Sequence, residues 1–235
     1  MQLLGYNINT ELPEIISGQK IVINTINPHS YCVAKEDEQF RQALLNGDYL
    51  LPDGVGIVYA AKVLNKKTIS RITGSDLHIY LLNIAQERGL KVFYLGASEQ
   101  TLELIGNKIA STYPAINMKS YSPPYKAEFS AEDSKQMIDA VNVFRPDVLF
   151  VGMTAPKQEK WVAQHHDAID ATVICSIGAV FDFFTGNVKR PGKFWQNMGL
   201  EWLPRLLGEP KRLFKRNFYS TPRFLWEVGK RMINV

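Results

Sequence analysis

The run LPDGVGIVYAAK at residues 51–62 carries the most information about the fold of this 235-residue chain. A short apolar segment, Tyr49 to Leu51, leads into it, and an apolar helical pattern follows Gly54. Between the two, Pro52 and Gly54 break the backbone and leave Asp53 at the end of a strand. Ligands of open α/β sheets bind outside the carboxyl ends of the strands. The run therefore predicts a carboxylate at a ligand site, although a tight turn or a helix cap uses the same residue types.

Working outward, short apolar runs recur and predict four further buried strands, at Ile21–Ile26, Val92–Leu95, Val148–Val151 and Thr172–Ile177. Between them, apolar residues return at helical spacing, as in the segments that follow Ser98 and Ser130. Strands that alternate with helices predict an α/β fold with a parallel sheet. The proline-containing segment Tyr121–Phe129 is predicted to be a loop between two such units.

The glycines after Asp53 suggest a main chain that a ligand can approach. Gly54-Val-Gly56 opens like a dinucleotide-binding fingerprint, but Tyr59 occupies the place of the third glycine. No Walker-type GK[ST] motif occurs anywhere in the chain. Neither nucleotide-binding motif is therefore complete, and the glycine pair is also typical of a simple turn.

The charge of the chain is unevenly distributed. Residues 189–235 hold 11 Lys and Arg against 3 Asp and Glu, a net charge of +8, whereas the rest of the chain carries −4. Aromatic residues are interleaved with these cations, a combination that suits an anionic lipid surface. With two cysteines, no secretory segment after Met1 and no apolar run of spanning length, the sequence predicts a reduced, cytoplasmic protein that does not span a membrane.

Metal and acyl-transfer chemistry find little support in the sequence. The four histidines lack HExxH or similar spacing, the two cysteines lie far apart, and there is no Asp-x-Asp pair. No GxSxG elbow is present either. We therefore expect no catalytic metal and no cofactor. What remains is a set of polar residues that follow the predicted strands: Thr25, Asn27, Asp53, Ser98, Thr154 and Gln158.

Six segments together resemble the WecG/TagA/CpsF family of bacterial glycosyltransferases, glycosyltransferase family 26. They are TINPHS at 25–30, LPDGVGIVYAAK at 51–62, SRITGSDL at 70–77, YLGAS at 94–98, VGMTAPKQEKW at 151–161 and IGAVFDFFTGNVKRPGKFWQNMGLEWLPRLLGEPKRLFKR at 177–216. Their order and spacing are similar across nearly the whole chain. The resemblance implies a Rossmann-like core at residues 1–190 and a basic, aromatic, helical appendage at 191–235 that covers the active site and lies near the membrane.

The resemblance further implies an inverting, metal-independent transferase that takes a sugar from a UDP-sugar donor. The implied acceptor is a polyprenyl-diphosphate-linked sugar at the inner face of the cell membrane, where the protein would be peripheral, and the implied pathways include teichoic acid, capsule and exopolysaccharide synthesis. Asp53 matches the catalytic base. Thr25 and Asn27 match an active-site pair, Gln158 and Glu159 match residues that contact the sugar or ribose, and Gly96 and Gly152 are expected to allow the nucleotide to approach.

A transferase without a metal needs fixed cations for the departing diphosphate. The candidates are Arg71, then Arg205 and Arg212, with Lys215 and Arg216 one turn beyond Arg212. Two other functions stay open at this stage: a UDP-sugar-binding scaffold without catalysis, and a nucleic-acid-binding module suggested by the basic tail. We favour the transferase without a nucleic-acid partner. The sequence leaves open the transferred sugar, for which N-acetylmannosamine is the best guess, and the oligomeric state, a homo-oligomer included.

Overall fold

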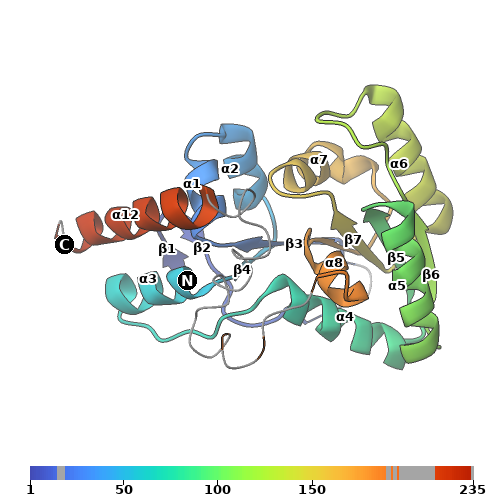
Figure 1. Ribbon diagram of the computed structural model, residues 1–235, viewed down its shortest axis with the longest axis horizontal. Coiled ribbons are helices and arrows are strands. Elements are labelled where there is room, and N and C mark those ends of the chain that lie inside the picture. The colour runs from blue at the N-terminus through green and yellow to red at the C-terminus, as the bar shows by residue number, and fades with distance from the viewer. Residues whose placement is uncertain (15–18, 189–191, 193–194, 196–214, 234–235) are drawn as a thin grey trace.

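The computed structural model describes residues 1–14, 19–188, 192, 195 and 215–233 of the chain. Its centre is a six-stranded sheet in the order β4-β3-β8-β7-β5-β6, in which every neighbouring pair is parallel. This confirms the predicted α/β class (Figure 1). The strands are β3 (Ile21–Ile26), β4 (Tyr49–Pro52), β5 (Lys91–Gly96), β6 (Asn117–Tyr121), β7 (Val148–Gly152) and β8 (Val173–Ser176).

Helices cover both faces of this sheet. One face packs against α4 (Gly74–Arg88), α5 (Glu99–Thr112) and α8 (Val180–Thr185), and the other packs against four helices. These four are α1 (Pro28–Ala34), α2 (Glu38–Leu45), α6 (Ala131–Phe144) and α7 (Lys157–His165), the last followed by the short turn η1 (His166–Ala168). In β3, Ile21 and Ile23 face the first group and Val22 faces the second, as a two-residue period requires.

The four strands predicted from apolar runs are present, and so is the segment that precedes Asp53. Two further elements lay outside the prediction. The edge strand β6 reads NMKSY and has no fully buried side chain, so it lacks the apolar pattern of an inner strand. A small antiparallel hairpin, β1 (Gln2–Leu3) and β2 (Tyr6–Asn7), precedes the main sheet.

Beyond the β4 edge of the sheet lie α3 (Val55–Asn65), the π-helical turn η2 (Lys215–Ser220) and the C-terminal helix α12 (Thr221–Ile233). Phe224 and Val228 of α12 are buried in the same apolar cluster as Tyr31 of α1 and Ile57 of α3. The Phe224 ring meets the Tyr31 ring edge-on, with the centroids 5.3 Å apart. The end of the chain therefore completes a core that begins with the first helices.

Ion pairs also join α12 to the end of α1. Lys35 pairs with Glu227 at 2.9 Å, and Arg223 pairs with Glu36. The boundary predicted at residue 191 falls among residues that are not described, so the division into core and appendage stays a prediction. Within the described residues, no helix is long and apolar enough to cross a bilayer.

The burial of α12 predicts a contrast between two of its aromatic residues. Phe224→Ala removes a side chain that is wholly buried, and we expect it to lower the free energy of unfolding by about 3–5 kcal/mol. Trp226→Ala, at a position that is 65% exposed, should change the free energy by less than about 0.5 kcal/mol. Urea unfolding of both variants measures the difference. Equal losses would show that α12 does not pack through Phe224.

Candidate active site

Asp53 lies where β3 and β4 end side by side. The strands pair in register up to Ile26 and Pro52, and the backbone N–H of Asp53 donates to the Ile26 carbonyl at 2.8 Å. Thr25 stands opposite Leu51 in this register, and Asn27 follows Ile26 directly. The structure therefore brings Thr25, Asn27 and Asp53 together at one corner of the sheet.

Asn27 has a structural task there. Its Oδ1 accepts hydrogen bonds from the backbone N–H groups of His29 and Ser30, both at 3.0 Å, and so caps the start of α1. Ser30 Oγ returns the contact by accepting from the Asn27 N–H at 2.7 Å. Because the carbonyl oxygen is used by the cap, the amide nitrogen is the part of this side chain suited to a ligand hydroxyl.

The two glycines after Asp53 serve different purposes. Gly54 adopts a φ of +102°, a conformation that residues with a side chain rarely take. A Cβ on Gly56 would lie 2.5 Å from Cγ of Pro28, so this glycine lets α3 pack closely on the start of α1. Packing between helices therefore accounts for Gly56, and the approach of a ligand to the main chain there stays a prediction.

Arg71 belongs to the same corner. The backbone N–H of Ile72 donates to the Pro52 carbonyl at 3.0 Å, which ties the segment before α4 to the end of β4. Thr73 then caps α4, and its backbone and side chain both bond to Asp76 in a reciprocal capping box. The backbone at Arg71 and the start of a 15-residue helix therefore lie next to the Asp53 turn.

Gln158 and Glu159 lie in the first turn of α7 and are buried, with exposed fractions of 3% and 4%. Gln158 Oε1 accepts from the Met153 N–H at 3.2 Å, and Gln158 Nε2 donates to Glu159 Oε1 at 2.9 Å. Burial raises the pKa of the Glu159 carboxyl to about 7. The Gln158 amide therefore links the end of β7 to α7, beneath the turn at Gly178, whose Cβ would lie 3.2 Å from Gln158 Oε1.

Gly96 and Gly152, opposite each other in β5 and β7, are also closely packed. A Cβ on Gly96 would lie 2.5 Å from the Gly152 carbonyl oxygen, and a Cβ on Gly152 would lie 2.5 Å from the Phe181 ring. Both glycines are therefore required by the packing of the strand ends and of α8. An approach of nucleotide to them stays a prediction.

Sequence reasoning missed two buried polar residues near these strand ends, Asn24 and Ser176. They follow the paired Ile23 and Cys175 in β3 and β8, and each is 1% exposed. Asn24 Nδ2 donates to the Ala43 carbonyl at 3.2 Å. Their only signal in the sequence is a polar residue inside the apolar runs IVINTI and VICS.

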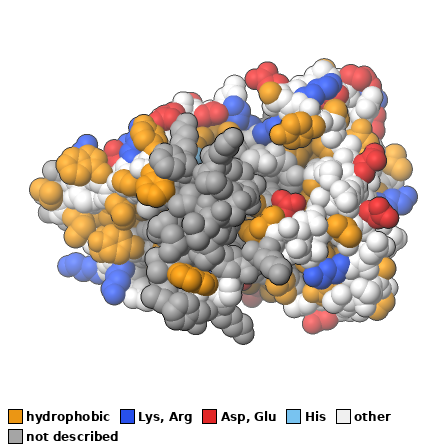
Figure 2. Space-filling model, in the orientation of Figure 1, with side chains coloured by type: hydrophobic (Ala, Val, Ile, Leu, Met, Phe, Trp, Pro, Cys, Tyr) orange, Lys and Arg blue, Asp and Glu red, His pale blue; other side chains and the backbone are white. Residues whose placement is uncertain are grey.

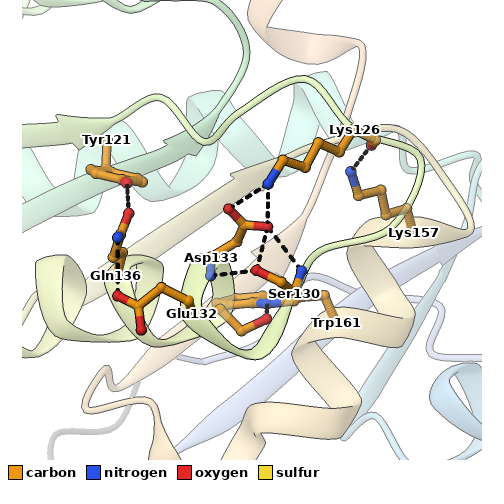
Figure 3. Close-up of polar contacts among 9 residues, drawn as sticks. Tyr121, Lys126, Ser130, Glu132, Asp133, Gln136, Lys157 and Trp161 are labelled. Atoms are coloured by element: carbon orange, nitrogen blue, oxygen red, sulfur yellow. Dashed lines mark hydrogen bonds and ion pairs between the residues drawn. The ribbon is translucent and has the colours of Figure 1, made fainter.

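The loop after β6 is held at the same edge of the sheet, as Figure 3 shows. Lys126 Nζ donates to both carboxylate oxygens of Asp133, at 2.9 and 2.8 Å, and Asp133 also forms a capping box with Ser130. The Lys126 hydrogen bonds, followed by those from Ser130, lower the pKa of Asp133 to about 2. Lys157 at the start of α7 donates to the Lys126 carbonyl and lies over the Phe129 ring. The predicted loop is thereby fixed beside α7.

Most candidate cations of the tail have no described side chain. Arg205 and Arg212 lie outside the described residues, and for Lys215 and Arg216 only the backbone of η2 is described. The end of η2 contacts α1, because Cys32 Sγ donates to the Ser220 carbonyl at 3.3 Å and His29 Nδ1 lies 2.8 Å from Ser220 Oγ. Among described residues, no group of three or more His, Cys, Asp or Glu is arranged to hold a metal ion.

This corner therefore combines a carboxylate, a hydroxyl, an amide and the segment of one arginine. Such a set can take a proton from a hydroxyl and stabilise negative charge nearby.

Comparison with known proteins points to one family. The model of the "Glycosyl transferase WecG/TagA/CpsF family" matches residues 2–234. A protein of Bacillus spizizenii named N-acetylglucosaminyldiphosphoundecaprenol N-acetyl-beta-D-mannosaminyltransferase is 32% identical over 97% of this chain and 86% of its own length. Proteins with the same name from Bacillus subtilis and Staphylococcus aureus are 33% and 29% identical, over 90% and 91% of this chain and 81% and 82% of their own lengths.

The buried Glu159 predicts a pH-dependent stability. Its pKa is about 7 in the folded protein and about 4.3 in an unfolded chain, so the folded state binds more protons between these values. As pH rises through this window, the free energy of unfolding therefore decreases, because the folded protein has to ionise a buried carboxyl. Glu159→Gln should remove that decrease, since the amide stays neutral.

We expect the urea midpoint of Glu159→Gln, relative to the unaltered protein, to increase between pH 5 and pH 8. The comparison cancels the effect of His78, which titrates in both proteins and whose pKa burial lowers to about 3. A difference that is constant with pH would mean that Glu159 is charged throughout.

Proposed function

Because this chain belongs to the WecG/TagA/CpsF family and is a glycosyltransferase, we propose that it moves a hexose or N-acetylhexosamine from a UDP-sugar to a polyprenyl-diphosphate-linked sugar. The similar proteins are named for an undecaprenol-linked acceptor and for the transfer of N-acetylmannosamine, which makes N-acetylmannosamine the best candidate here. The transfer inverts the anomeric carbon and uses no metal ion. The observation that carries this proposal is the convergence of Thr25, Asn27, Asp53 and the Arg71 segment at one corner of the sheet.

Asp53 acts as the general base in this mechanism. Its carboxylate takes the proton of an acceptor hydroxyl while that oxygen attacks the anomeric carbon from the face opposite the UDP group. A carbon–oxygen bond to the acceptor forms as the bond to the diphosphate oxygen breaks, and the electron pair leaves with UDP. Thr25 and Asn27 position hydroxyl groups of the donor or the acceptor.

Negative charge grows on the departing diphosphate, and fixed positive charge must receive it. Arg71 and the backbone N–H groups at the start of α4 supply such charge from the segment tied to Pro52. Arg205, Arg212, Lys215 and Arg216 contribute from the tail. Gln158 and Glu159, which are buried and bonded to each other at the start of α7, contact the sugar or ribose of the donor.

The protein works at the inner surface of the cell membrane as a peripheral protein. The described part of the tail supports this role, because α12 exposes the apolar side chains of Trp226 and Ile233 alongside the cations Lys230 and Arg231. Exposed apolar and cationic side chains on one helix are typical of attachment to anionic lipid. A protein attached in this way can reach a lipid-linked acceptor whose hydrocarbon chain stays in the bilayer.

Replacing the proposed base tests the mechanism. Asp53→Asn should lower kcat by about 10²–10⁴-fold, because the amide cannot accept the proton, while the Kd of UDP stays within about twofold. Release of UDP in the presence of donor and acceptor measures kcat. Asp170→Asn removes an exposed carboxylate that pairs with Arg145, and it should leave kcat unchanged.

Unchanged turnover in Asp53→Asn would exclude this residue as the base. A protein that binds UDP-sugar yet shows no transfer with any acceptor would instead fit the scaffold.

The donor and the need for a metal are tested together. We expect one member of a panel of UDP-sugars to release UDP in the presence of a short-chain lipid-diphosphate sugar, with N-acetylmannosamine the first candidate. The rate should be the same with and without a chelator. A rate that falls on chelation and returns on addition of a divalent cation would contradict the metal-independent mechanism.

A further inference from the structure

An apolar groove runs along the surface between α3 and α12. Its lining consists of Tyr59 on α3 and of Leu225, Val228, Gly229 and Met232 on α12. The volume is about 340 Å³, near the lower end of the range for sites that hold small ligands. None of the lining side chains carries a charge, so the groove favours hydrocarbon over a polar ligand.

The groove starts close to Asp53. The first turns of the two helices are in contact, since a Cβ on Gly56 would lie 3.5 Å from Cε1 of Phe224. Both helices then run away from the sheet side by side (Figure 1). Asp53 stands two residues before α3, and Tyr59 lies about 6 Å along the helix axis from Val55. A chain in the groove therefore has one end within about two helical turns of the proposed base.

The rim of the groove is partly apolar and partly cationic. On α3, Val55 and Tyr59 are about half exposed, and the exposed Lys62 continues the same stripe at helical spacing. On α12, Lys230 lies 5.3 Å from the centre of the exposed Trp226 ring, on the face of the helix next to the one that lines the groove. Figure 2 shows the apolar side chains of this end of the molecule as a cluster with cations at its margin. The charge pattern complements a ligand with a hydrocarbon chain near an anionic surface.

We propose that this groove binds the first isoprene units of the acceptor's polyprenyl chain, next to its diphosphate. The inference rests on the proposed function. That function requires the diphosphate-linked sugar of the acceptor to reach Asp53 while the hydrocarbon chain stays in apolar surroundings. A second copy of the protein is a poorer occupant, because specific protein interfaces bury about 1,200–2,000 Å² and this groove is lined by five residues.

Filling the groove tests the proposal. A Cβ on Gly229 meets no atom within 4 Å, so Gly229→Leu places its side chain in open space between the helices. Transfer is measured in detergent with two acceptors that share the diphosphate sugar, one on an undecaprenyl chain and one on an ethyl group. We expect the KM of the undecaprenyl acceptor to rise at least tenfold, and the KM of the ethyl acceptor, the KM of the donor and kcat to stay within about twofold.

Two other variants support the interpretation. Met232→Trp narrows the same groove from a half-exposed position, and it should reproduce the effect if Gly229→Leu is poorly folded. Val143→Leu adds a methylene group on α6, where Val143 is 84% exposed, and should leave both KM values unchanged. Thermal unfolding of each variant verifies that the fold is retained.

The alternatives give different results. An unchanged KM for the undecaprenyl acceptor in both groove variants, or an equal rise for both acceptors, would overturn the proposal. A loss of binding to anionic vesicles without acceptor, with unchanged KM values in detergent, would assign the groove to the bilayer instead and would also overturn it.

A measurement that needs no turnover separates this inference from the proposed function. Undecaprenyl diphosphate that carries a photoactivatable group on its first isoprene unit should cross-link to Tyr59 or Met232, and Gly229→Leu should reduce the yield at least fivefold. Cross-linking with no transfer to any acceptor would reject the proposed function and retain the groove. Transfer without cross-linking to α3 or α12 would retain the proposed function and reject the groove as the site of the polyprenyl chain.

Discussion

The close contact between Gly56 and Pro28 is the constraint on which the proposed site depends. With no space for a Cβ on Gly56, the start of α3 lies directly against the start of α1. The two helices begin where the paired strands β3 and β4 end, beside the Asp53 N–H that bonds to the Ile26 carbonyl and the Asn27 cap of α1. Any side chain at position 56 would move Asp53 relative to Thr25 and Asn27, because the interior has no room to absorb it.

The strands were predictable because each inner strand is mainly apolar and is buried on both faces. The edge strand β6 was not, since its exposed side chains leave a polar sequence that is typical of a loop. The corner formed by Thr25, Asn27 and Asp53 was predictable from position, since polar residues that follow parallel strands gather at one edge. The resemblance to a family added roles for them that position alone does not supply.

Burial was harder to predict than position. Gln158 and Glu159 are polar and follow a strand end, so the sequence favoured contact with a ligand, yet the structure buries both and bonds them to each other. Gly56, Gly96 and Gly152 similarly suggested an open main chain, and each lies against a neighbouring atom or ring. Such packing depends on residues distant in the chain, Phe181 for Gly152 and Pro28 for Gly56. A local sequence pattern therefore does not predict it.

The position of Phe224 has a consequence for biosynthesis. The apolar cluster formed by α1, α2 and α3 is complete only when α12 is added, and α12 is made more than 150 residues after α3. While the ribosome translates the intervening chain, Tyr31 and Ile57 have no cover from Phe224. The first third of the protein therefore emerges as an unfinished unit that exposes apolar surface, and its folding is delayed until synthesis is almost finished.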